Sequence, residues 1–429
     1  SFGLGFFLTG VSWVYVSLSV FGGMPWWLAG VAAFLFCCVL ALFPMLAGWA
    51  FKRWQPESLW QQALYFAALI AAVDWLRSWI FTGFPWLTVG YSQAAPSPLA
   101  GFAALLGVHG LSLLVTLSGA LLLTCWRLGL FVVATLAIGG FGLQQVDWTT
   151  PVGEPISVAL VQGNVPQEMK FRPEAFIRTL DLYRELVEQN PAQLIILPET
   201  AIPAFFDQLP AHYIEALKSA AQRHGGDLIL GTLTGGGERY FNSAISLGQS
   251  PLQVYSKNHL VPFGETIPPG FSWFMKFASI PMSSFSQGPE NQPPLAVVGQ
   301  RVAVNICYED VFGEEIIAAL PAAGILANLS NTAWFGRSLA QPQHLQIAQM
   351  RASETGRQML RATNTGMTAV VGADGVVQAA LPAFTQGVLK AEVRAYEGMT
   401  PYASFGNLGF LLLTIGFLVI GRLPVRRIR

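Results

Sequence analysis

Three residues of types that catalyse acyl transfer each follow, or lie beside, a strand-like run. Glu199 lies in the segment LIILPET, and a carboxylate at the end of a buried strand can serve as a general base. Cys307 follows the run VAVNI, and its thiolate would be a nucleophile. Lys257 precedes the sequence PFGE, and an ammonium group there would stabilise a thiolate and later an oxyanion. Together these side chains predict covalent catalysis through a cysteine.

Each of the three residues also has an ordinary structural explanation. Glu199 fits a helix cap or a surface carboxylate, Cys307 fits a small buried hydrophobe, and Lys257 fits a solvated strand edge. His259 would allow a cysteine–histidine protease, but no sequence context typical of such proteases accompanies it. The combination of motifs, and none of them alone, therefore favours catalysis.

Five neighbouring residues are candidates for substrate binding or for support of the catalytic groups. Glu265 supplies a second carboxylate after Lys257, and Tyr308 and Glu309 directly follow Cys307. Asn331 and Trp334 follow another strand-like run, and they are candidates for the lining of an acyl pocket, with simple packing as the alternative. The four cysteines form no CxxC pair, so we expect neither a zinc site nor a disulfide framework.

The composition of the chain indicates a membrane protein. Of its 429 residues, 53% are hydrophobic and only 11% are charged, whereas soluble domains carry about 25% charged residues. The formal net charge is zero, so nothing indicates a nucleic-acid partner.

Apolar segments that could cross a bilayer occupy both ends of the chain. They lie at roughly 1–19, 26–50, 59–80, 99–125, 128–146 and 405–421, and a spanning helix needs about 20 apolar residues. Buried helices of a soluble protein are the alternative, but tryptophans at the segment edges favour the membrane. The sequence begins without methionine, inside an apolar stretch, so we expect further spans to precede it.

Basic residues in the short loops predict the orientation in the membrane. They follow the second, fourth and sixth segments and are Lys52, Arg53, Arg127, Arg422, Arg426, Arg427 and Arg429. The loops at 20–25 and 81–98 contain no lysine or arginine. The basic side is expected to be cytoplasmic. The predicted domains are therefore transmembrane helices at 1–147, a periplasmic catalytic domain at 148–404, and a final helix with a basic tail at 405–429.

Region 148–404 alternates strand-like and helix-like segments, which predicts a layered α/β domain. Asp374-Gly375 lies between two apolar runs and predicts a hairpin turn. The predicted strands are Ile156–Val161, Leu194–Leu197, Asp227–Leu233, Val302–Ile306, Ile325–Leu329 and Thr368–Val371, and the predicted helices are Pro173–Gln189, His212–His224 and Leu339–Met359.

The order of the glutamate, lysine and cysteine motifs resembles the nitrilase superfamily over about residues 155–395. Those enzymes use a Glu-Lys-Cys triad on an α-β-β-α sandwich. The sequence is most similar to the membrane-embedded branch of that superfamily, the apolipoprotein N-acyltransferases. Six segments carry this similarity: Gly10–Tyr15, Gly83–Leu87, Val161–Gly163, Lys257–Glu265, Pro281–Phe285 and Asn331–Gly336.

The resemblance implies acyl transfer from a phospholipid, such as phosphatidylethanolamine, to the α-amino group of the diacylglyceryl-cysteine that begins an apolipoprotein. It implies a ping-pong mechanism through a Cys307 thioester, no metal or other cofactor, and a monomer in the bacterial inner membrane. The aromatic segment 268–281 is a candidate lid that touches the bilayer surface. A membrane-anchored nitrilase-type amidase and a transporter are the alternatives. Few polar residues lie in the spans, which disfavours the transporter.

Overall fold

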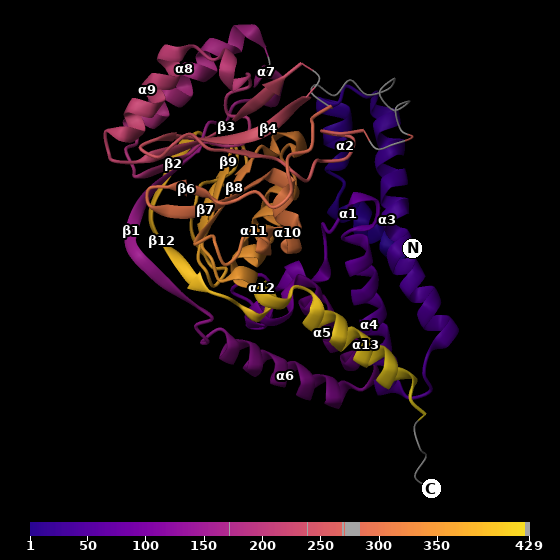
Figure 1. The fold of residues 1–429 in the computed structure, drawn as a ribbon. Coiled ribbons are helices and arrows are strands. Elements are labelled where there is room, and N and C mark those ends of the chain that lie inside the picture. The colour runs from indigo at the N-terminus through magenta and orange to yellow at the C-terminus, as the bar shows by residue number, and fades with distance from the viewer. Residues whose placement is uncertain (171, 238, 268–269, 271–283, 425–429) are drawn as a thin grey trace.

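The computed structural model describes residues 1–424 apart from 171, 238, 268–269 and 271–283. Apolar helices from both ends of the chain pack together (Figure 1). The segment between them folds into two stacked sheets that carry helices on their outer faces (Figure 1). The predicted helical bundle with an α/β domain is therefore confirmed.

The apolar helices follow the predicted segments. The first segment is a bent pair in which α1 (Phe2–Gly10) meets the stretch Val14–Phe21, including α2 (Val14–Val16), at 57°. Among the described residues, four helical stretches are long and apolar enough to cross a membrane, and the bent pair would make five. The four contain α3 (Trp26–Trp54), α4 (Leu59–Arg77), α5 (Ala103–Thr124) and α6 (Trp126–Leu143).

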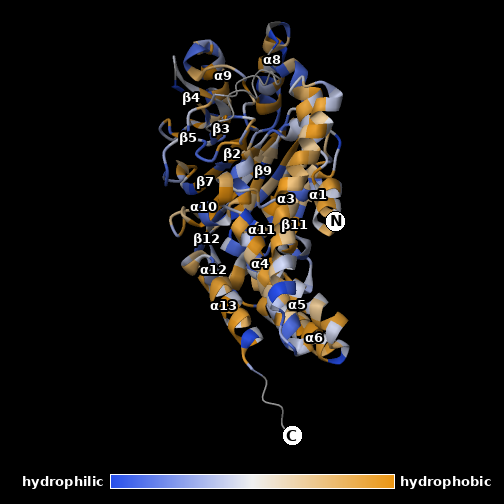
Figure 2. Ribbon diagram, turned by 90° about the vertical axis from the view of Figure 1, so that its right-hand side faces the viewer, coloured by the Kyte–Doolittle hydropathy of each residue, from blue (hydrophilic) through white to orange (hydrophobic). Residues whose placement is uncertain are grey.

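The last apolar helix, α13 (Leu408–Arg422), has 15 residues and is shorter than those four. It packs with α4 and α5 around small residues, including Ala67 and Ala71, and around Phe410. Small residues let helix backbones approach closely inside a membrane. Hydrophobic residues dominate α1 and α3 (Figure 2), and large apolar side chains of α3 remain exposed, as expected of a surface that faces lipid.

The α/β domain contains two sheets of six strands each. The first sheet has the order β12-β1-β2-β3-β4-β5 and the second has the order β11-β10-β9-β8-β7-β6. In both sheets the central strands pair in parallel and the edge strands pair antiparallel. The strands are β1 (Thr149–Gln162), β2 (Leu194–Ile196), β3 (Asp227–Gly236), β4 (Arg239–Gly248), β5 (Val254–Ser256), β6 (Leu295–Val297), β7 (Gln300–Ile306), β8 (Ile325–Ser330), β9 (Met359–Thr363), β10 (Ala369–Val371), β11 (Val377–Ala380) and β12 (Gly387–Gly398).

Three layers of buried apolar side chains hold this domain together. The layer between the sheets includes Leu160 and Ile196 from the first sheet and Ile306 and Leu329 from the second. A second layer lies under α8 (Pro173–Gln189) and α9 (Ala211–Gln222), and a third lies under α10 (Gly313–Ile317) and α11 (Ala340–Thr355). The result is the expected α-β-β-α sandwich.

The structure contains every predicted strand and helix of this domain and adds several elements. The predicted helix Leu339–Met359 is wrong at its carboxyl end, because α11 ends at Thr355, before the left-handed Gly356, and Met359 begins β9. Gly375 has φ +80° between β10 and β11, which confirms the predicted hairpin turn. The sequence did not predict β4, β5, β6, β9, β11 or β12. In β12, exposed charged residues such as Lys390 and Glu392 interrupt the apolar pattern, and β5 and β6 are only three residues long.

The bundle and the sandwich share one hydrophobic core. Phe7 and Trp13 from the amino-terminal helices pack in the same cluster as Tyr308 and Phe312, which follow β7, and Met350 of α11. The catalytic segment after β7 is therefore packed directly against the membrane helices.

Glycine is required at one point of this junction. Gly107 of α5 has φ +65°, and a Cβ there would lie 2.3 Å from the ring of Tyr402 in α12 (Pro401–Phe405). The close approach of α5 to α12 therefore depends on the missing side chain.

Candidate active site

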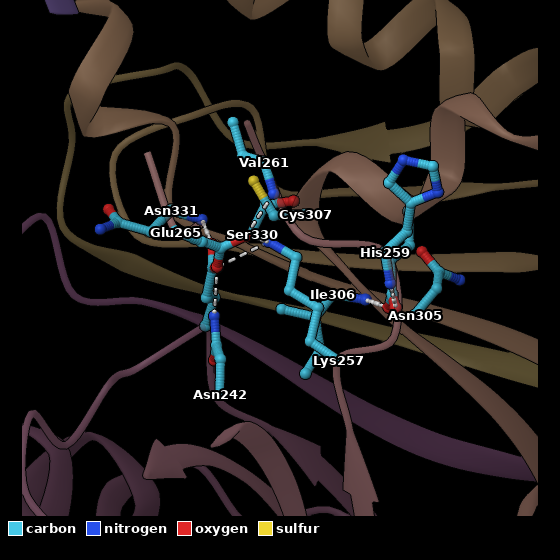
Figure 3. A network of polar contacts seen from close by, with 12 residues as sticks. Asn242, Lys257, His259, Val261, Glu265, Asn305, Ile306, Cys307, Ser330 and Asn331 are labelled. Carbon is cyan, nitrogen blue, oxygen red and sulfur yellow. Dashed lines mark hydrogen bonds and ion pairs between the residues drawn. The ribbon is translucent and has the colours of Figure 1, made fainter. Parts of the chain in front are cut away.

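The two sheets bring the three predicted catalytic residues together. Glu199 follows β2 and Lys257 follows β5 in the first sheet, whereas Cys307 follows β7 in the second sheet. Their exposed fractions are 7%, 1% and 8%. Figure 3 shows the Lys257 side chain extending toward the Glu265 carboxylate, with Cys307 beside it. The site is thus a buried junction that neither sheet forms alone.

Lys257 lies among two carboxylates. Its Nζ is 2.7 Å from Oε2 of Glu265 and 3.6 Å from Oε1 of Glu199. The side-chain amide of Asn242 in β4 donates to both carboxylates, at 2.8 Å to Glu199 and 3.1 Å to Glu265. The backbone N–H of Asn331 donates to Oε2 of Glu199 at 2.7 Å. These donors fix both carboxylates around one ammonium group.

Burial and the neighbouring negative charges have opposite effects on the pKa of Lys257. Burial lowers the pKa of Lys257, but Glu265, and after it Glu199 and Cys307, outweigh burial and hold that pKa above its ordinary value. Lys257 therefore stays an ammonium at neutral pH.

The cysteine is in the opposite situation. Burial raises the pKa of the Cys307 thiol, Glu199 raises it further, and Lys257 only partly offsets them. The resting thiol is therefore protonated and needs a base before it can attack. Glu199 has the right chemistry for that base, and it is a neighbour of the thiol close enough to affect its pKa. Cys307 also has φ +54°, a sparsely populated conformation that functional sites often contain.

Glu309 joins the Lys257 loop to the Cys307 loop. Its carboxylate accepts hydrogen bonds from the backbone N–H groups of Asn258, His259 and Ile306, at 2.7, 3.1 and 2.6 Å, and from the Tyr255 hydroxyl at 2.9 Å. Burial raises the pKa of Glu309 to about 7, although the backbone donors oppose that rise. Glu309 thus acts on the position of Lys257 and Cys307 through the backbone.

Tyr308 connects the site to the membrane part. Its hydroxyl donates to the carbonyl of Gly83, in the loop that follows α4, at 3.1 Å, and its ring packs edge-on against Phe312. Burial places the pKa of Tyr308 well above its ordinary value, so this hydroxyl remains a donor. Tyr308 therefore ties the residue after the nucleophile to the helical bundle.

Asn331 and Trp334 make contacts other than the predicted pocket lining. The Asn331 side chain donates to Gln167 at 2.8 Å and accepts from Asn364 at 3.0 Å, while its backbone serves Glu199. The ring of Trp334 packs edge-on against Phe21, and its carbonyl accepts a hydrogen bond from the Ser17 hydroxyl at 2.8 Å. Asn331 supports the base, and Trp334 contacts the amino-terminal helices.

Two polar residues of this site, Asn242 and Lys170, were not predicted from the sequence. Asn242 lies in β4, which has no long apolar run, and Lys170 ends the four-residue helix α7 (Gln167–Lys170). In each case the sequence shows only a single polar side chain, with no motif around it that indicates a role in the site. Within the described residues, His, Cys, Asp and Glu form no metal-binding group. The candidate lid at 268–281 lies, except for Gly270, outside the described residues.

Comparisons with known proteins assign both parts of the chain. The carbon-nitrogen hydrolase family model matches residues 157–402, which contain the Glu199, Lys257 and Cys307 site. The model of the apolipoprotein N-acyltransferase N-terminal domain matches residues 1–121. The fold and the site thus define a membrane-embedded enzyme of the carbon-nitrogen hydrolase, or nitrilase, class.

Curated relatives resolve the family within that class. An apolipoprotein N-acyltransferase from Nitrosomonas europaea is 50% identical over 98% of this chain and 86% of its own length. Those from Chromobacterium violaceum and Ralstonia nicotianae are 45% and 46% identical, over 96% and 95% of this chain and 82% and 80% of theirs. The chain belongs to the apolipoprotein N-acyltransferase family.

Proposed function

We propose that this protein transfers a fatty acyl chain from a phospholipid, such as phosphatidylethanolamine, to the α-amino group of the amino-terminal diacylglyceryl-cysteine of apolipoproteins. This is the final step of bacterial lipoprotein maturation. One observation carries the proposal: the residues that directly follow Cys307 in the buried Glu-Lys-Cys site pack in one hydrophobic cluster with apolar helices suited to lipid. An enzyme with a lipid donor needs both features in one body.

The first half-reaction forms an acyl-enzyme. Glu199 takes the thiol proton of Cys307, and the sulfur attacks the ester carbonyl of the phospholipid. Lys257 stabilises the negative charge that develops on the carbonyl oxygen. The tetrahedral intermediate collapses, the ester C–O bond breaks, and Glu199 returns the proton to the leaving alkoxide. A lysophospholipid leaves and a thioester remains on Cys307.

The second half-reaction transfers the acyl group to nitrogen. The α-amino group of the lipoprotein attacks the thioester carbonyl, and Glu199 accepts a proton from that nitrogen. The C–S bond breaks, an amide forms, and the thiol of Cys307 is regenerated when the proton returns to sulfur. Two chemical steps through one covalent intermediate predict ping-pong kinetics. No metal or other cofactor takes part in this scheme.

Water must be kept from the thioester during the interval between the two steps. The small exposure of Glu199, Lys257 and Cys307 supports such exclusion. Glu265 acts as the counter-ion of Lys257, and Glu309 and Tyr308 hold the two catalytic loops in place.

The proposed cellular arrangement follows from charge and connectivity. The protein is a monomer in the bacterial inner membrane. Its helices at 1–147 and 405–429 lie in the bilayer, and its catalytic domain at 148–404 faces the periplasm. The basic loops that include Lys52 and Arg127 then face the cytoplasm.

Intact-mass spectrometry after incubation with phosphatidylethanolamine tests the proposal. The wild type should gain the mass of one fatty acyl group, released by hydroxylamine, and Cys307→Ala should gain none. Cys125→Ala, which removes a cysteine of the membrane part, is the matched control and should be labelled like the wild type. Equal labelling of Cys307→Ala, or no labelling of the wild type, would remove Cys307 from the role of nucleophile.

A second stage separates acyl transfer from hydrolysis. When a diacylated lipopeptide is added to the labelled enzyme, the acyl group should appear on the peptide amine. If free fatty acid is released at the same rate with and without the peptide, the protein is a membrane-anchored hydrolase and not an acyltransferase.

A further inference from the structure

A second buried lysine lies beside the catalytic carboxylate. Lys170, at the end of α7, is 3% exposed, and its Nζ donates to the backbone carbonyl of Glu199 at 3.1 Å. Gln167, from the same short helix, accepts from the Asn331 side chain, and the Asn331 backbone binds the Glu199 carboxylate. The helix α7 therefore belongs to the framework around the base.

Lys170 and Lys257 differ in their counter-ions. Lys257 has the carboxylates of Glu265 and Glu199 within ion-pair distance. Lys170 forms no ion pair within the part of the chain that the structure describes, and its one hydrogen bond there is to a neutral carbonyl. An ammonium group has three donors. Lys257 directs its donors to two carboxylates, whereas Lys170 uses only one of its donors among the described residues.

The charge of Lys170 acts on the reacting groups. Burial lowers the pKa of Lys170 to about 8, while Glu199 and Cys307 oppose that fall. Lys170 is therefore mostly an ammonium at pH 7. Because electrostatic coupling is reciprocal, a cation that Glu199 and Cys307 favour must favour the ionised forms of both in return.

We propose that Lys170 is an electrostatic positioning residue of the active site, which holds the Glu199 backbone and favours negative charge on Glu199 and Cys307. During acylation one negative charge moves from the Glu199 carboxylate to the sulfur and then to the acyl oxygen. Lys257 is already paired with Glu265, so Lys170 adds a second positive charge beside the groups between which this charge moves. The inference rests on the proposed function only for the identity of the reaction.

Three substitutions separate the charge from the hydrogen bond. Lys170→Gln keeps an N–H donor for the Glu199 carbonyl but removes the charge, Lys170→Met removes both, and Lys170→Arg keeps both. Lys390→Gln, which changes an exposed lysine of β12, is the matched control. Thermal unfolding in detergent identifies any variant that fails to fold, and Lys170→Gln is the variant on which the conclusion depends.

Two rates are measured for each folded variant. One is acyl-enzyme formation with phosphatidylethanolamine, and the other is alkylation of Cys307 by iodoacetamide as a function of pH, followed by peptide mass spectrometry. We expect Lys170→Gln and Lys170→Met to slow both acylation and alkylation about tenfold or more at pH 7. The difference in alkylation rate from the wild type should shrink above pH 8, where Lys170 itself loses its proton. Lys170→Arg should stay close to the wild type in both.

The two readouts also separate the possible failures. If Lys170→Gln matches the wild type in both rates, Lys170 only supports the backbone and the inference is wrong. If the wild type forms no acyl-enzyme, the proposed function fails. The alkylation rate at pH 7 would still decide the role of Lys170, because it does not depend on the acyl donor.

Discussion

Lys257 lies 2.7 Å from the Glu265 carboxylate but 3.6 Å from the Glu199 carboxylate. The nearer carboxylate is therefore the counter-ion, and the farther one remains available to exchange a proton with Cys307. The backbone N–H of Val261 donates to the same Glu265 oxygen at 2.9 Å, so that oxygen cannot easily turn away. Glu265 therefore carries the ion pair with Lys257, which leaves Glu199 the role of general base that we propose for it.

Removal of the counter-ion should affect the lysine more than the base. Glu265 contributes the largest rise in the pKa of Lys257, so Glu265→Gln should let burial lower that pKa. Because Lys257 must stay protonated, the basic limb of the pH–rate profile should move to lower pH, and acyl-enzyme formation should fall about 100-fold. The measurement is the initial rate of acylation from pH 6 to pH 10.

Glu290→Gln, which changes an exposed carboxylate near the site loop, is the matched control for that experiment. Its profile should superimpose on that of the wild type. A Glu265→Gln enzyme with an unmoved basic limb would contradict the counter-ion role.

Asn242 bridges the two carboxylates, and its charge state should matter more than its size. Asn242→Asp would place a third carboxylate beside Glu199 and Glu265 in a buried site, where like charges repel strongly. We expect it to lose more activity than Asn242→Ala, and to recover part of it at low pH as a proton neutralises the cluster. Acylation rates at pH 5.5 and 7.5 for both variants test this order. An Asn242→Ala enzyme that is the weaker of the two would show that the bridge acts through its hydrogen bonds alone.

The pKa of Glu309, about 7, should appear in the pH dependence. The ionised carboxylate accepts from Asn258, His259 and Ile306, so activity should fall as the pH drops through that value and Glu309 takes up a proton. Tyr255→Phe deletes another donor to Glu309 and should raise its pKa, which moves the acid limb of the profile to higher pH. Tyr396→Phe, in β12, should leave the limb unchanged. An acid limb that moves to lower pH in Tyr255→Phe would refute this assignment.

A second buried network, behind the nucleophile, should govern stability. Asp310 contacts Nε2 of His344 at 2.8 Å and Arg361 at 3.2 Å, and all three side chains are almost completely buried. Asp310→Asn would leave the Arg361 charge without its counter-ion, which should cost about 3–5 kcal/mol of unfolding free energy. Thermal or denaturant unfolding in detergent measures the loss.

The exposed pair Asp181–Arg184, with N–O distance 2.9 Å, gives the comparison for that measurement. Asp181→Asn should cost no more than about 1 kcal/mol, because solvent screens a surface ion pair. Equal losses for the two variants would mean that burial does not set the importance of the Asp310 pair.

The sequence was informative where a residue of a catalytic type directly follows a regular apolar run. Glu199 and Cys307 each follow an apolar strand, so their position at the carboxyl end of a strand could be predicted from the pattern alone. Lys257, after a strand of only three residues, was recognisable through its PFGE motif. The membrane helices could be predicted equally well, because few structures other than a membrane-spanning helix contain so long an apolar run.

The remaining features depend on contacts between segments that are far apart in the sequence. Asn242 and Lys170 reach Glu199 from β4 and α7, and no local pattern records that approach. The same limit explains Glu309, whose sequence position beside Cys307 indicated importance without showing that its partners are backbone groups on the Lys257 loop. Trp334 shows the converse, because its neighbours belong to helices more than three hundred residues away.

The pairing of β1 with β12 has a consequence for how such a protein can arise. Thr149 lies opposite Gly398 in the antiparallel ladder, so the sandwich receives the chain from α6 and returns it to α12 at neighbouring points. A domain whose two ends meet can be inserted at a single position of a host chain without separating the helices on either side. The catalytic sandwich is in this sense an insertion between α6 and α12 of a membrane protein, because its first and last strands begin and end side by side.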